Sequence, residues 1–118
     1  MKKPTEAALA AFDAAFPDDE RAVRKKMFGM PAGFVNGNMF LGVWDNGVVY
    51  RLPVERQLEL GEAHDTLGPF EPGGRRWKDY VHADVASGSE VLAGWATEAL
   101  DHTATLPPKP KKAKKSKK

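Results

Sequence analysis

The sequence predicts an α+β domain: an antiparallel β-meander with an N-terminal and a C-terminal helix packed on one face of the sheet. Two tight-turn signals, Asn36-Gly37 and Asp45-Asn46-Gly47, each lie between apolar segments in the middle of the chain. Asn-Gly favours a hairpin because both central positions of its turn require a positive φ. Amphipathic helical patterns stand before and after this region. Strands that follow one another directly, with helices outside them, are typical of the α+β class.

Two long helices are predicted from apolar residues that recur on one face with a 3.6-residue period. The first covers residues 5–16, with Thr5 as its N-cap and Pro17 as its end. The second covers residues 88–104 and follows a Ser-x-x-Glu sequence, Ser87 to Glu90, which has the spacing of a capping box.

Three meander strands are predicted over 32–36, 39–44 and 48–52. The spacing leaves open whether the second turn has two or three residues, and that length sets the register. With an Asn46-Gly47 turn, the residues on the core face of the sheet are Leu41, Val43, Tyr50 and Leu52.

The region after the meander predicts a short helix, a loop and a fourth strand. The helix covers 54–63 with Val54 and Leu58 facing inward, and the loop of 64–74 has Phe70 as its large apolar anchor. Residues 77–82 predict the fourth strand. A further strand over 24–28, paired beside the meander, would bring Lys26 and Arg51 together on an anion-binding face.

Composition excludes several classes of protein. The 118 residues suffice for one domain with a hydrophobic core, and 42% hydrophobic with 29% charged residues is ordinary for a globular protein. The chain has no cysteine, so it has no disulfide, thiolate metal site or cysteine nucleophile. It lacks the apolar run of a signal peptide and the longer run of a membrane span, so we expect a cytoplasmic protein without membrane contact.

The charge divides the chain into an acidic body and a basic tail. Residues 109–118 hold seven of the 18 basic residues and no acid, so residues 1–108 carry 11 basic against 16 acidic side chains. We expect a folded domain over 1–106 and a disordered lysine-rich tail over 107–118, because the tail has nothing to bury.

Catalytic and metal sites are not indicated. The three histidines, His64, His82 and His102, stand in no ligand pattern, and Ser87 and Ser89 are explained as helix-capping residues. We therefore expect neither an enzyme nor a metal or cofactor.

Basic residues form three groups that suit phosphate contacts: Arg24-Lys25-Lys26, Arg75-Arg76 with Lys78, and the tail. Gly73-Gly74-Arg75-Arg76 forms either an anion-binding loop or a solvated one. The tail either lies along a polyanion or merely aids solubility. The predicted nucleic-acid contacts are Arg24, Lys25, Lys26, Arg51, Arg75, Arg76, Lys78, Lys109, Lys111, Lys112, Lys114, Lys115, Lys117 and Lys118.

Three short motifs in order resemble the N-terminal domain family of TfoX, also called Sxy. They are Lys26-Met27-Phe28-Gly29, Gly37-Asn38-Met39-Phe40 and a third strand ending at Arg51, and Trp77-Lys78-Asp79-Tyr80-Val81 resembles a later block. The resemblance covers about residues 20–104. It implies an α+β domain without catalytic residues and a regulatory role, as in competence regulation. We expect the lysine tail to take the place of the helical domain that follows in TfoX itself.

The predicted function is therefore a non-enzymatic, TfoX-like regulatory protein that binds DNA or RNA through its tail and basic surface. The alternative is a protein-interaction adaptor, or a homodimer, that uses the sheet face opposite the helices, with Trp44, Tyr50 or Tyr80 exposed on it. A small-molecule role would require a deep pocket near His64 or His82.

Overall fold

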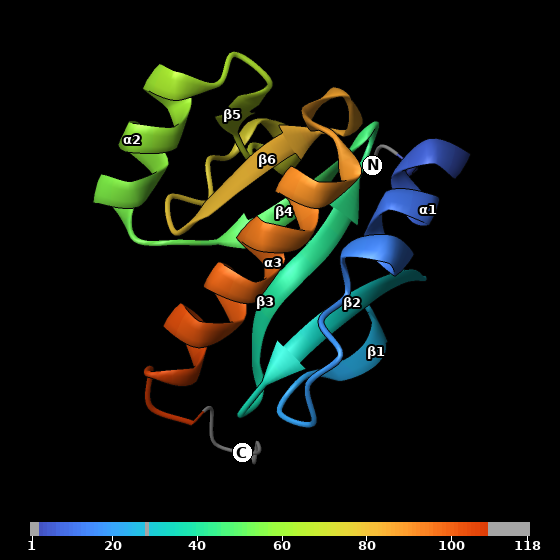
Figure 1. Cartoon of the computed structure of the whole chain (residues 1–118), viewed down its shortest axis with the longest axis vertical. Coiled ribbons are helices and arrows are strands. Elements are labelled where there is room, and N and C mark those ends of the chain that lie inside the picture. Colours follow the sequence, from blue (N-terminus) through green and yellow to red (C-terminus); the bar gives the residue numbers. More distant parts are fainter. Residues whose placement is uncertain (1–2, 28, 109–118) are drawn as a thin grey trace.

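The computed structural model describes residues 3–27 and 29–108, and Figure 1 shows one antiparallel sheet with helices packed against it. The sheet has the strand order β1-β2-β3-β4-β6-β5. The strands are β1 (Val23–Met27), β2 (Met30–Val35), β3 (Asn38–Trp44), β4 (Gly47–Arg51), β5 (Leu67–Pro69) and β6 (Tyr80–Asp84). The first four form a meander, so the α+β prediction is confirmed.

Both predicted hairpin turns are present, and each contains two residues. Asn36 and Gly37 have φ values of 53° and 81°, which is the conformation that Asn-Gly adopts readily. In the second hairpin Trp44 pairs with Gly47, so the turn has two residues, Asp45 and Asn46. The predicted Asn46-Gly47 turn is therefore wrong by one residue, although the predicted core face is unchanged, since Leu41, Val43, Tyr50 and Leu52 are all buried.

Helices α1 (Glu6–Ala15) and α3 (Ser89–Ala104) lie on the same face of the sheet and contact each other (Figure 1). The Thr5 side chain accepts a hydrogen bond from the Ala8 N–H, which confirms the predicted N-cap. Tyr50 is fully buried between sheet and helix, and its hydroxyl donates to the Leu92 carbonyl oxygen at 2.7 Å. The prediction that Tyr50 lies on the core face is therefore confirmed, and Tyr50 is excluded from the three aromatic residues offered for the opposite face.

Helix α3 is capped differently from the prediction. Gly88, with a φ of 98°, is the N-cap residue and provides no side-chain hydrogen bond. The Ser87 hydroxyl instead donates to the Thr66 hydroxyl oxygen at 2.7 Å. The Ser-x-x-Glu spacing therefore does not form a capping box here.

Helix α2 (Val54–Ala63) has its predicted position and the opposite orientation about its axis. Val54 and Leu58 are 46% and 64% exposed, so the prediction that they face inward is wrong. Gln57 and Leu60 are buried instead. The Gln57 amide nitrogen donates to the carbonyl oxygens of Leu52 and Lys78, both at 2.9 Å, and these bonds compensate for its burial.

The sheet extends beyond the predicted strands on both sides. Strand β1 pairs with β2 along its whole length, as predicted for 24–28, although residue 28 lies outside the described residues. The fourth strand, predicted over 77–82, is β6, which starts at Tyr80 and pairs with β4. Strand β5 lies within the predicted loop of 64–74 and pairs with β6.

The centre of the sheet is buried on both faces. A β-bulge shifts the β2–β3 register after Gly33. Gly33 pairs with Leu41 and the next residue of β2 pairs with Met39, so Phe40 has no partner on β2. Phe40 and Leu41 are consequently both fully buried. Strand β4 is buried from Gly47 to Tyr50. Among the described residues, no helix is both long and apolar enough to span a bilayer.

Two strand glycines differ in the space around them, and this difference gives a stability prediction. A Cβ on Gly47 would overlap the Ala83 carbonyl oxygen and lie 2.5 Å from the His82 ring, whereas one on Gly42 would meet Met39 and Val49 at 3.7 Å. We expect Gly47→Ala to lower the free energy of unfolding by about 1–3 kcal/mol through overpacking. Gly42→Ala should leave it unchanged or slightly raised.

Urea denaturation of the two variants and the native chain measures this difference. Equal unfolding midpoints for Gly47→Ala and Gly42→Ala would contradict the packing described at the β4–β6 pairing.

Candidate functional site

The sheet face opposite α1 and α3, called the open face here, is covered by the loop of residues 70–79, which contains a short 3-10 turn (Pro72–Gly74). Among the described residues no α-helix packs on this face. Phe70 and Trp77 from this loop continue an edge-to-face series of rings that begins at Trp44 and ends at Tyr80. Successive ring centroids in the series lie 5.2–5.6 Å apart. Such contacts add about 0.5–1.5 kcal/mol per pair to the free energy of burial, so they hold the loop on the sheet.

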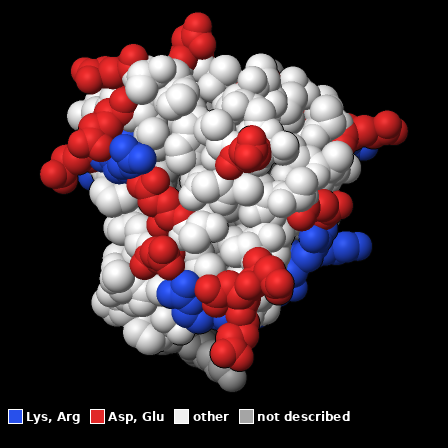
Figure 2. All heavy atoms as spheres, in the orientation of Figure 1, with Lys and Arg blue, Asp and Glu red and all other residues white. Residues whose placement is uncertain are grey.

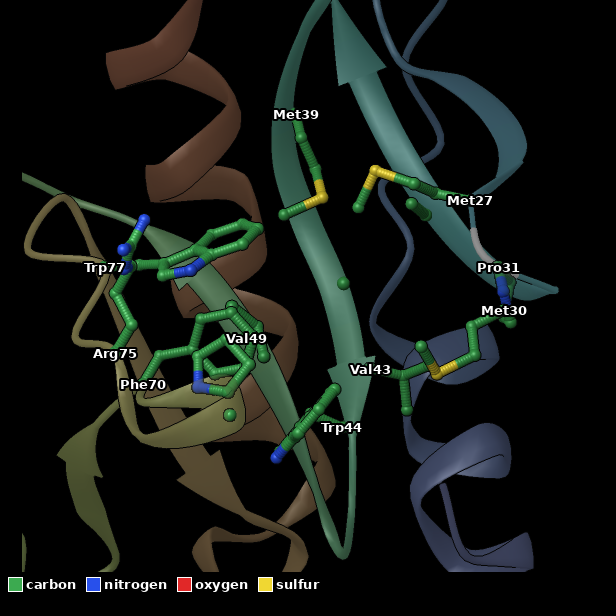
Figure 3. Close-up of a pocket in the computed structure, with 14 residues that line it drawn as sticks. Met27, Met30, Pro31, Met39, Val43, Trp44, Val49, Phe70, Arg75 and Trp77 are labelled. Atoms are coloured by element: carbon green, nitrogen blue, oxygen red, sulfur yellow. The ribbon is translucent and has the colours of Figure 1, made fainter. Parts of the chain in front are cut away.

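A cavity of about 330 Å³ remains between the loop and the sheet. In Figure 3 the side chains of Met27 and Met39 point toward one another, and the rings of Trp44, Phe70 and Trp77 lie on the other side. The residues that line the cavity are Met27, Met30, Pro31, Ala32, Met39, Gly42, Val43, Trp44, Val49, Phe70, Pro72, Gly73, Arg75 and Trp77. Arg75 lies beside Trp77 and is the charged residue in this set.

A second hollow adjoins the cavity and shares Met27, Met39 and Trp77 with it. Arg51 and Tyr80 line this hollow. The Arg51 guanidinium donates to the Tyr80 hydroxyl at 3.3 Å and lies 3.6 Å from the Asp79 carboxylate. The Tyr80 hydroxyl donates in turn to the Met39 carbonyl oxygen at 3.0 Å.

Burial and charge around this cluster shift two pKa values. Burial raises the pKa of Tyr80 and outweighs the opposing effect of Arg51. His102 has a lowered pKa, because it is partly buried and because the Arg51 charge disfavours a second cation nearby. The Arg51 guanidinium thus has the Tyr80 hydroxyl and the Asp79 carboxylate as partners in the folded chain.

Arginines on the helix-covered side are paired with acids. Arg21 binds Asp19 and Asp101, and its hydrogen bonds lower the pKa of Asp19 to about 2. Arg56 binds Glu59 and Glu98. Most of the charged surface that Figure 2 shows on this side is acidic.

Strand β1 presents its three predicted contact residues to different surroundings. Arg24 binds Asp13 and lies over the ring of Phe12, so it belongs to the helix-covered side. Strand alternation places Lys26 on that same side and Lys25 on the open face, where its ammonium lies 5.8 Å from the centre of the Phe34 ring.

The structure does not bring Lys26 and Arg51 together. Strands β2 and β3 separate them in the sheet, and they point to opposite faces. The expectation that these two residues form one anion-binding face is wrong, because the strand expected to approach Arg51 pairs at the far edge of the sheet.

The remaining predicted contacts fall into two groups. Arg75, Arg76 and Lys78 are exposed in the loop over the open face, and within the described part of the chain none of them forms an ion pair. Glu71 and Asp79 are acids of the same loop. The lysines of the tail, Lys109–Lys118, lie outside the described residues.

Histidines and serines of the described chain form no catalytic arrangement that the hydrogen bonds support. His64 packs its ring edge-to-face on Trp95 at 5.1 Å, while the neighbouring Ser87 donates to Thr66 and not to His64. His82 Nε2 donates to the Trp44 carbonyl oxygen at 2.8 Å. Residues 3–27 and 29–108 contain no cluster of three or more His, Asp or Glu residues that could hold a metal ion.

The sequence does not predict this cavity, and neither His64 nor His82, the residues near which a small-molecule role would require a pocket, lines it. The feature of the sequence that could have indicated the cavity is the position of three aromatic residues, Phe70, Trp77 and Tyr80, around a glycine-rich loop. Nothing in that spacing indicates that the loop folds back over Met27 and Met39, which are more than 30 residues earlier in the chain.

Comparison with known proteins adds no assignment to this geometry. No family model, no curated protein and no solved structure matches the chain significantly.

Proposed function

We propose that this protein is a non-enzymatic regulatory domain of the TfoX N-terminal type that binds nucleic acid in the cytoplasm. Two observations support the proposal. The chain carries the short motifs on which the resemblance depends, and its fold is of the α+β class that the resemblance implies.

The group of unpaired cations on β1 and on the loop over the open face is the observation that carries the proposal. Arg21, Arg24 and Arg56 on the helix-covered side are bound to carboxylates. Four described cations of β1 and of the loop over the open face lie in no ion pair: Lys25, Arg75, Arg76 and Lys78. On the helix-covered side Lys26 is unpaired as well among the described residues, but it has no other unpaired cation of β1 or the loop beside it on that face. A phosphate can bind such groups without first displacing an acid.

This arrangement supports electrostatic capture without sequence readout. Lys25 and the loop cations flank the cavity from the two sides, since β1 and the loop both contribute to its lining. The lysines of 109–118 would add contacts along the phosphate backbone. Arg24 and Arg51 would contribute less, because Asp13 and Asp79 already neutralise them.

The proposal predicts a steep salt dependence of DNA binding with two separable parts. Log K should fall with log salt by about 0.9 per phosphate neutralised on a duplex. Replacing the seven tail lysines by glutamine should reduce the slope most. Replacing Lys25, Arg75, Arg76 and Lys78 by glutamine should reduce it further. Fluorescence anisotropy of a labelled duplex from low to high salt measures each slope.

Arg56→Gln is the matched control, because it removes one positive charge from the helix-covered side. Its slope should equal that of the native chain. Binding that is insensitive to salt, or that survives both sets of substitutions unchanged, would overturn the proposal.

A second candidate, a protein-interaction adaptor, is favoured by one observation. Trp44, Trp77 and Tyr80 are half-buried around an apolar hollow on the open face, and aromatic residues of this kind anchor interfaces. A homodimer through this face predicts a dimer mass by light scattering at high protein concentration, lost in Trp77→Ala. A monomer at all concentrations would exclude self-association.

A further inference from the structure

The cavity on the open face has the size and walls of a small-molecule site. Its volume of about 330 Å³ is at the lower end of the range for ligand pockets, about 300–1,000 Å³. Its walls come from segments far apart in sequence: Met27 on β1, Met39 on β3, and Phe70 and Trp77 on the loop (Figure 3). Methionine side chains adapt readily to the shape of an apolar guest.

A glycine keeps the floor of the cavity open. Gly42 pairs with Val49 in the middle of the sheet, where any side chain would point toward Met39. A Cβ there would be in ordinary contact at 3.7 Å, so the backbone does not require glycine for lack of space at that atom. Longer side chains at this position would extend into the cavity.

The charge at the cavity has one sign. Arg75 lines it, and no Asp or Glu is among the lining residues. Arg75 is exposed and has no ion pair within residues 3–27 and 29–108, unlike Arg51 in the adjoining hollow, which is bound to Asp79. A guanidinium group matches the geometry of a carboxylate and binds it through paired hydrogen bonds.

We propose that the cavity binds a small apolar carboxylate, such as a medium-chain fatty acid. The hydrocarbon part lies between the methionines and the tryptophans, and the carboxylate binds Arg75. This site goes beyond the proposed nucleic-acid binding and shares only Arg75 with it, because neither the methionines nor Gly42 contributes to phosphate contacts.

Three probes of equal chain length test the chemistry of the site: octanoate, octanol and octylammonium. Trp44 and Trp77 line the cavity, so their fluorescence should change saturably on binding, with calorimetry as a second readout. Octanoate should bind about tenfold more tightly than octanol, because it adds a charge-assisted hydrogen bond. Octylammonium should bind most weakly. Absence of saturable octanoate binding, or tighter binding of octylammonium, would overturn the proposal.

Three variants of the full chain test the location. Gly42→Val places two methyl groups in the cavity and uses a residue that suits a strand, so it should weaken octanoate binding while the urea midpoint stays near the native value. Arg75→Gln should reduce octanoate affinity to that of octanol. Arg76→Gln removes the neighbouring charge, which does not line the cavity, and should leave affinity unchanged.

Native octanoate affinity in a folded Gly42→Val variant would contradict the location. Equal losses in Arg75→Gln and Arg76→Gln would contradict the carboxylate contact. Should Gly42→Val fail to fold, the two arginine variants still decide the proposal, because both residues are exposed.

Discussion

The two central strands must be covered on both faces, and the rest of the structure follows from this requirement. Strands β3 and β4 are apolar almost throughout, and nearly all of their residues are buried. Helices α1 and α3 cover one face, where Tyr50 of β4 and Leu92 of α3 belong to the same buried core. Within residues 3–27 and 29–108 no α-helix covers the other face, and the loop of 70–79 covers it with Phe70 and Trp77.

A covering made of a loop differs from one made of helices. Two helices that contact each other and the sheet leave little space, whereas the loop touches the sheet through a few large rings and leaves a cavity beside them. The same loop carries Arg75, Arg76 and Lys78, and its backbone has positive φ at Gly73 and Gly74. The requirement to bury the open face thus places apolar space and unpaired cations side by side, and both proposals concern this juxtaposition.

Local signals in the sequence were sufficient for the meander and the long helices. Asn36-Gly37 and the Thr5 cap depend on neighbouring residues only, and both are as predicted. The orientation of α2 was wrong because Gln57 is buried through hydrogen bonds to Leu52 and Lys78, which lie outside the helix. Strand β5 was missed because Gly68 and Pro69 disfavour a strand unless a neighbour such as β6 pairs with it.

The candidate site was predictable only in its charges. The basic groups could be listed from the sequence, but not which of them an acid neutralises, because the Arg24–Asp13 and Arg51–Asp79 pairs form only in the folded chain. The bulge at Phe40 also breaks the alternation of β3, so the sequence did not show which methionines face the cavity.

The central claim is that the open face is the functional face, and an NMR titration of the full chain with a short DNA duplex tests it most directly. We expect the amide shifts to change around Lys25 and along 70–78, with little change in α1 and α3. Changes confined to the helices, or none anywhere in the folded body, would contradict it.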